Sequence, residues 1–79
     1  MRIGSVTLIL ETPERAVDVN RGLLRDGEIA RHCTVVYINA TTIRLDTHWP
    51  RVCIDWLVGQ EVINPATDNY VLEDSANGN

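Results

Sequence analysis

Residues 33–48, CTVVYINATTIRLDTH, predict two β-strands joined by a short turn. Pairing Ile38 with Ile43 places Val36 opposite Leu45, so four aliphatic side chains share one face of this hairpin. The other face carries a mixture of apolar and charged side chains, namely Val35, Tyr37, Arg44 and Asp46. A hairpin with two such faces is expected in a half-buried sheet whose second face serves as a docking surface.

A strand and a helix are predicted before the hairpin. Residues 2–11 alternate between polar and apolar positions, and Ile3 and Ile9 fall on the more polar side of this strand. Thr12-Pro13-Glu14 is a helix-start pattern, because a threonine can accept hydrogen bonds from the first free amides and a proline suits the first turn. The helix is expected to run from Pro13 to about Arg25.

A second helix, about nine residues long, is predicted after the hairpin, between Pro50 and Gly59. Its inward face is expected to hold four apolar side chains, namely Val52, Cys53, Trp56 and Leu57. The chain contains no phenylalanine, so Trp49 and Trp56 are expected to be the only very large residues of the core.

The order of these elements predicts the fold class. A β-α-β-β-α order indicates a single small α+β domain over residues 1–72, with a three-stranded, mainly antiparallel sheet and two helices on one face. Residues 28–32 are either a connector or one further helical turn, and residues 70–72 are either an edge strand or a clip on the surface. Residues 73–79, EDSANGN, contain nothing to bury and are expected to form a flexible, disordered acidic tail.

Two helices cannot cover both faces of such a sheet. The face left open is expected to carry Ile3, Ile9, Val35, Tyr37 and Cys33. A chain of 79 residues buries little surface by itself, so an uncovered apolar face predicts a protein partner or a homodimer.

Charge is distributed unevenly along the chain, whose net charge is −4. Residues 1–44 carry six arginines and five carboxylates, a net charge of +1, whereas residues 45–79 carry one arginine and six carboxylates, a net charge of −5. An acidic surface repels a phosphate backbone and attracts a basic surface. We therefore expect no direct binding to nucleic acid and a protein partner such as a nucleic-acid-handling complex with a basic surface. The alternative is that the carboxylates only keep a small protein soluble.

Cysteine content and apolar runs bear on location. The sequence contains two cysteines, no secretory leader pattern and no apolar stretch long enough to cross a bilayer. We therefore expect a cytoplasmic protein with reduced thiols that does not bind a membrane.

Only a few side chains are candidates for metal ligands or catalytic groups. Four of them lack the spacing of a zinc site, namely His32, Cys33, His48 and Cys53. In the hairpin register above, Cys33 lies opposite His48, and such a pair is either an activated thiolate or a small apolar cysteine beside a polar histidine. A Cys33–Cys53 disulfide is geometrically feasible, but a reducing compartment disfavours it. Asp46 and Asp55 are expected at solvated positions, and we expect no enzyme activity, no cofactor and no metal.

Two segments resemble a known family. Residues 11–24, ETPERAVDVNRGLL, and residues 34–48, TVVYINATTIRLDTH, followed by an apolar helix, are similar to the smallest subunit of the KEOPS tRNA-modifying complex, the CTAG/Pcc family. The resemblance covers residues 5–58 and implies a protein that dimerises through its sheet and docks on a kinase-like catalytic subunit without catalysing a reaction. This chain departs from the family in a short connector over residues 24–33 and in a last helix that Gly59 and Pro65 cut short.

Three functions follow from these observations. The first is a non-enzymatic protein-binding module that docks on a larger complex and modulates or inhibits it, such as a phage-encoded, anti-CRISPR-like antagonist of host defence, because small acidic lysine-free domains without an active site are typical of phage proteins. The second is an accessory dimerising subunit of a KEOPS-like complex, and the third is a small Cys/His hydrolase or metal-binding protein. The predicted interface residues are Tyr37, Val35, Arg44, Asp46, Ile9, Asp55 and Glu61.

Overall fold

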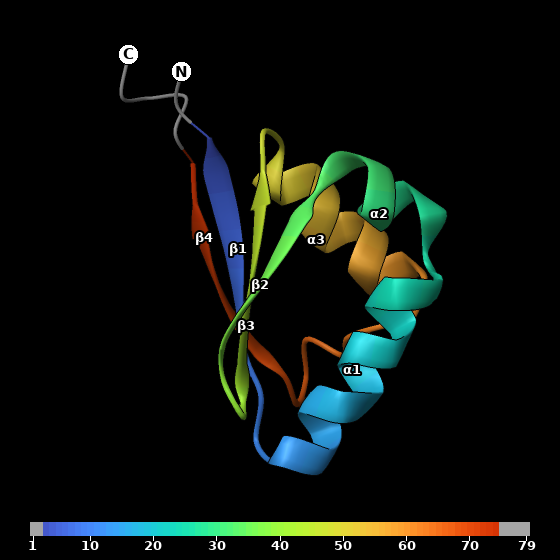
Figure 1. Ribbon diagram of the computed structural model, residues 1–79, viewed down its shortest axis with the longest axis vertical. Coiled ribbons are helices and arrows are strands. Elements are labelled where there is room, and N and C mark those ends of the chain that lie inside the picture. The colour runs from blue at the N-terminus through green and yellow to red at the C-terminus, as the bar shows by residue number, and fades with distance from the viewer. Residues whose placement is uncertain (1–2, 75–79) are drawn as a thin grey trace.

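The computed structural model describes residues 3–74, which form an α+β fold (Figure 1). The strands are β1 (Gly4–Ile9), β2 (Thr34–Asn39), β3 (Thr42–Thr47) and β4 (Asn69–Glu73). The helices are α1 (Pro13–Arg25), α2 (Gly27–His32) and α3 (Pro50–Gly59). The α+β class is as predicted, but the described residues contain four strands and three helices, not three strands and two helices.

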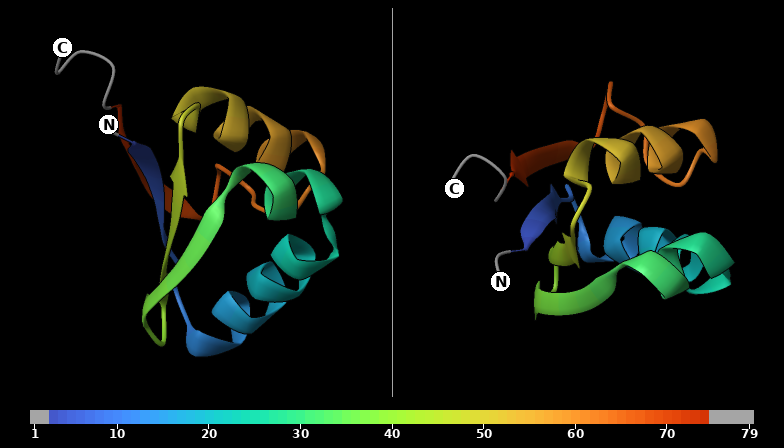
Figure 2. Two further views of the ribbon diagram at one scale, coloured as in Figure 1. Left: turned by 45° about the horizontal axis from the view of Figure 1, so that its top comes forward. Right: turned by 90° about the horizontal axis from the view of Figure 1, so that it is seen from above.

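The four strands form one antiparallel sheet in the order β2-β3-β1-β4. Strand β3 lies between β1 and β2, and β1 lies between β3 and β4, so each helical connection crosses one intervening strand in a split β-α-β arrangement. The three helices all lie on one side of the sheet, and no element of residues 3–74 covers the opposite face (Figure 2). One open sheet face is therefore a property of the fold.

Helix α2 forms because Asp26 caps it. The Asp26 Oδ1 atom accepts hydrogen bonds from the backbone amides of Glu28 (2.9 Å) and Ile29 (3.3 Å), which have no partner within the helix. The Ile29 side chain is buried in the core. The segment at residues 28–32 is therefore a helix and not an irregular connector.

Strand β4 forms because a long-range ion pair positions the segment before it. Asp68 is buried, and its Oδ2 atom lies 2.6 Å from Nη2 of Arg15 in α1. The same carboxylate accepts a hydrogen bond from the backbone amide of Asn64, and Arg15 also donates to the backbone oxygen of Val62. Strand β4 then pairs with β1 over residues 69–73, so residues 70–72 form an edge strand and not a clip on the surface. Residues 75–79 of the predicted tail lie outside the described residues.

The hairpin register differs by one residue from the prediction. Val35 pairs with Leu45 and Tyr37 pairs with Ile43, and a bulge lies between Tyr37 and Asn39. A shift of one residue moves every side chain of a strand to the other face. The predicted placement of Val35, Tyr37 and Cys33 on the open face is therefore wrong, because the register puts them on the helix side of the sheet.

The core lies between the sheet and the three helices. Its fully buried aliphatic side chains come from both layers: Val6, Leu8, Val19, Leu23, Leu45 and Leu57. The two tryptophans are not core residues, because both are exposed. A core made of aliphatic residues leaves the large aromatic side chains on the surface, where they are available for contacts with other molecules.

Candidate functional site

The open sheet face is a mixture of polar and apolar side chains. Strand register places Val36, Arg44, Thr7 and Val71 in one row across the sheet, flanked by a polar row and by a row that contains Ile9. Ile9 and Val71 are exposed, as predicted for Ile9. Arg44 and Asp46 form an ion pair on this face, with Nε and Oδ1 2.8 Å apart. The face is thus more polar than predicted.

Tyr37 and Val35 lie on the helix side of the sheet, where Tyr37 remains exposed. Val35 packs against the core from β2. The Tyr37 hydroxyl donates a hydrogen bond of 2.6 Å to Oδ1 of Asn20 in α1, which ties an edge strand to the first helix. Neither residue shares a surface with Ile9 or with the Arg44–Asp46 pair.

A second surface combines three large apolar side chains, Trp49, Val52 and Trp56, which we call the tryptophan patch. Their exposed fractions are 58%, 65% and 40%, respectively. The three side chains line one pocket of about 220 Å³, together with residues of α2, the two cysteines and Thr47 at the end of β3. Tryptophan at the rim of a small apolar pocket is typical of the residues that dominate binding energy at protein interfaces.

The prediction that Val52 and Trp56 face inward is wrong. Helix α3 buries Cys53, Ile54 and Leu57, and it exposes Val52 and Trp56. The helix carries two apolar stripes, and the periodicity of the sequence does not distinguish the stripe that faces the sheet from the one that faces solvent. A helix sequence with two apolar stripes was the feature of the sequence that could have indicated a second apolar surface.

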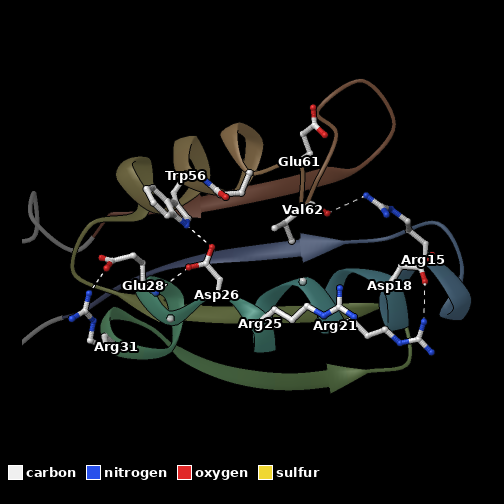
Figure 3. Close-up of a pocket in the computed structure, with 13 residues that line it drawn as sticks. Arg15, Asp18, Arg21, Arg25, Asp26, Glu28, Arg31, Trp56, Glu61 and Val62 are labelled. Carbon is white, nitrogen blue, oxygen red and sulfur yellow. Dashed lines mark hydrogen bonds and ion pairs between the residues drawn. The ribbon is translucent and has the colours of Figure 1, made fainter.

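A charged groove of about 960 Å³ adjoins the tryptophan patch, between α1 and α2 on one side and α3 with the segment after it on the other (Figure 3). The Nε1 atom of Trp56 donates a hydrogen bond to Oδ2 of Asp26 across this groove, so Trp56 lines both the groove and the pocket. The wall of the groove carries four arginines and four carboxylates: Arg15, Arg21, Arg25, Arg31, Asp18, Asp26, Glu28 and Glu61. Because these charges balance, the groove does not favour an anion or a cation by charge alone.

Two of the predicted interface residues lie close to the tryptophan patch. Asp55 is exposed on α3, three residues after Val52 and therefore on a neighbouring part of the helix surface. Glu61 is exposed and lines the groove that Trp56 also lines. The structure thus divides the seven predicted residues into three groups. Asp55 and Glu61 lie by the patch, and Val35 and Tyr37 lie on the helix side of the sheet. The remaining three lie on the open sheet face, namely Ile9, Arg44 and Asp46.

The candidate chemical residues are arranged differently from the prediction. Thr34 pairs with Asp46, so the register brings Cys33 beside Thr47 and not beside His48. The Sγ atom of Cys33 lies 3.7 Å from that of Cys53 instead, and both cysteines are free thiols. Among residues 3–74, no three His, Cys, Asp or Glu side chains are grouped so that they could hold a metal ion.

Comparison with protein-family models, with curated proteins and with solved structures finds no significant match for this chain. The resemblance to the smallest KEOPS subunit therefore stays a prediction. In the part of the chain that the structure describes, the helices are too short or too polar to cross a membrane.

Proposed function

We propose that this chain is a non-enzymatic protein-binding module and that the tryptophan patch is its binding surface. The observation that carries the proposal is the exposure of Trp49, Val52 and Trp56 around one small pocket. A pocket of about 220 Å³ is smaller than the 300–1,000 Å³ typical of sites for drug-sized ligands, and it suits a single side chain of a protein partner.

The partner is a protein that presents an apolar side chain with a basic residue beside it. The apolar side chain fills the pocket between Trp49 and Trp56. The basic residue meets Asp55, which is exposed on α3 beside Val52, or Glu61, which lines the adjoining groove. These carboxylates support a partner with a basic surface, such as a nucleic-acid-handling complex that the module modulates or inhibits. Asp46 and Asp68 do not contribute to an acidic docking surface, since each is paired with an arginine.

Site-specific photo-crosslinking in an extract of the native host tests this proposal. A photoreactive amino acid replaces Val52 in one protein and Leu24 in another, because Leu24 is 68% exposed on α1 and lies outside the linings of the pocket and groove. We expect one protein to be captured from position 52 and not from position 24. Identical capture from both positions, or no capture from position 52, would contradict the proposal.

A second candidate function is an accessory subunit that dimerises through its sheet. The open face of the four-stranded sheet supports it, because Ile9 and Val71 are exposed there and the Arg44–Asp46 pair can meet its own counterpart across a two-fold axis. We expect sedimentation equilibrium to give a dimer that Val71→Asp converts to a monomer and that Val52→Asp leaves intact. A monomer at every protein concentration would exclude this candidate.

A further inference from the structure

Two cysteines that are far apart in the sequence lie next to each other in the pocket that the tryptophan patch lines. Cys33 follows α2 and Cys53 lies on α3, and both line the pocket. Their Sγ atoms are 3.7 Å apart, which exceeds the length of a disulfide bond by about 1.7 Å. The two sulfur atoms are thus in contact in the folded protein without a bond between them.

The two thiols differ in their access to solvent. Cys53 is buried, whereas Cys33 is half-buried and is reached through the pocket. Around the pocket stand apolar side chains, including Trp49, Val52 and Trp56. A reagent with a small apolar group can thus reach Cys33 first, with Cys53 directly behind it.

The surroundings of the two thiols favour a thiolate on Cys33. A hydrogen bond with Cys53 and another with Thr47 lower the pKa of Cys33 to about 7 against the effects of burial and of the Asp26 charge. The same pairing and the burial of Cys53 raise the pKa of that thiol. Glu28 and His32 of α2 also line the pocket. A more exposed thiolate beside a buried thiol is the arrangement of an attacking and a resolving cysteine.

We propose that Cys33 and Cys53 form a dithiol site that reacts with a small disulfide carrying an apolar or aromatic group. In the first step, the Cys33 thiolate attacks one sulfur of the substrate, which forms a mixed disulfide on Cys33 and releases the other half of the substrate as a thiolate. In the second step, Cys53 loses its proton and attacks the Cys33 sulfur, which closes the Cys33–Cys53 disulfide and releases the second half as a thiol. The dithiol loses two electrons, and the substrate disulfide is reduced by two electrons. The reaction does not require that the tryptophan patch bind a protein, but a partner side chain in the shared pocket would cover Cys33, so the site belongs to the protein without its partner.

The test uses the purified protein and the neutral aromatic disulfide dithiodipyridine, which releases a coloured thione at each step. We expect the wild-type protein to release two molecules of thione and to end with a mass lower by two hydrogen atoms. Cys53→Ala should release one molecule and keep a pyridyl group on Cys33. Cys33→Ala should leave Cys53 at least about tenfold less reactive than Cys33 is in Cys53→Ala. Alkylation of wild-type Cys33 should follow a midpoint near pH 7, which Cys53→Ala moves upward.

Three results would overturn the proposal. The first is a wild-type protein that ends with two mixed disulfides and no internal bond, and the second is equal reactivity of the two cysteines in the single variants. The third is that phenylarsine oxide, which binds two neighbouring thiols at once, fails to block the reaction of the wild-type protein with dithiodipyridine. The first and third results use only the wild-type protein, so they stay decisive if Cys53→Ala does not fold.

Discussion

One buried carboxylate, Asp68, ties the C-terminal strand to the first helix. Its hydrogen bond from Arg15 holds the pKa of Asp68 below its ordinary value, so the folded state binds this proton less tightly than the unfolded state does. The resulting stability is fully present above the ordinary aspartate pKa of about 3.9 and is lost as the pH falls through the lower pKa of the folded state.

Asp68→Asn is expected to lower the free energy of unfolding near pH 7 by about 2 kcal/mol, because it leaves Arg15 without its charged partner. The variant should also lose part of the pH dependence of stability below about pH 4. Urea unfolding at neutral and acidic pH measures both effects. Asp18→Asn is the matched control, because Asp18 and Arg21 form an exposed pair 3.9 Å apart, which contributes little. Equal effects of the two substitutions would contradict this role of Asp68.

Single residues also explain why the register of the hairpin could not be predicted from the sequence. Alternation in residues 34–47 correctly indicated two strands, and Ile43 and Leu45 are core residues as predicted. The register was wrong because the bulge between Tyr37 and Asn39 adds one residue to β2. The Asn39 side chain accepts a hydrogen bond from the Thr41 amide and shapes this turn, and alternation alone does not reveal such a contact.

At the scale of elements, Asp26 joins two helices and positions a residue of the tryptophan patch. One of its carboxylate oxygens caps α2, and the other accepts the hydrogen bond from Trp56 in α3. Asp26→Ala should lower stability by about 2 kcal/mol, because both the cap and the Trp56 contact are lost. Asp26→Asn keeps a good capping residue and should cost about half as much. Chemical denaturation measures the two losses, and the indole N–H resonance of Trp56 reports the contact. An unchanged indole N–H resonance in Asp26→Ala would contradict the hydrogen bond between Trp56 and Asp26.

Helices and strands could be predicted from the sequence where neighbouring residues alone determine them. The first helix begins after Thr12, whose Oγ1 accepts a hydrogen bond from the Arg15 amide, as its start pattern indicated. Residues 28–32 and 70–72 stayed ambiguous because α2 depends on a side-chain cap and β4 depends on an ion pair between residues 53 positions apart. The outward stripe of α3 was not identified because two apolar stripes have the same helical period.

At the scale of the whole molecule, the split β-α-β arrangement separates the two surfaces that are available to partners. All three helices lie on one side, so the open sheet face and the tryptophan patch belong to opposite layers (Figure 2). The sequence predicted that one sheet face would stay open, and the fold agrees. It placed five of the seven docking residues on that face, however, whereas the largest exposed aromatic side chains lie on the helical layer.

The central claim is that the tryptophan patch binds a protein, and the most direct measurement is the Kd of the purified chain for the protein captured at position 52. Val52→Asp should raise the Kd at least about tenfold, a loss of about 1.4 kcal/mol, because it places a charge at the apolar pocket. Leu24→Asp, an equally exposed change on α1, should leave the Kd unchanged. Equal Kd values for wild type and Val52→Asp, with both proteins folded, would contradict the claim.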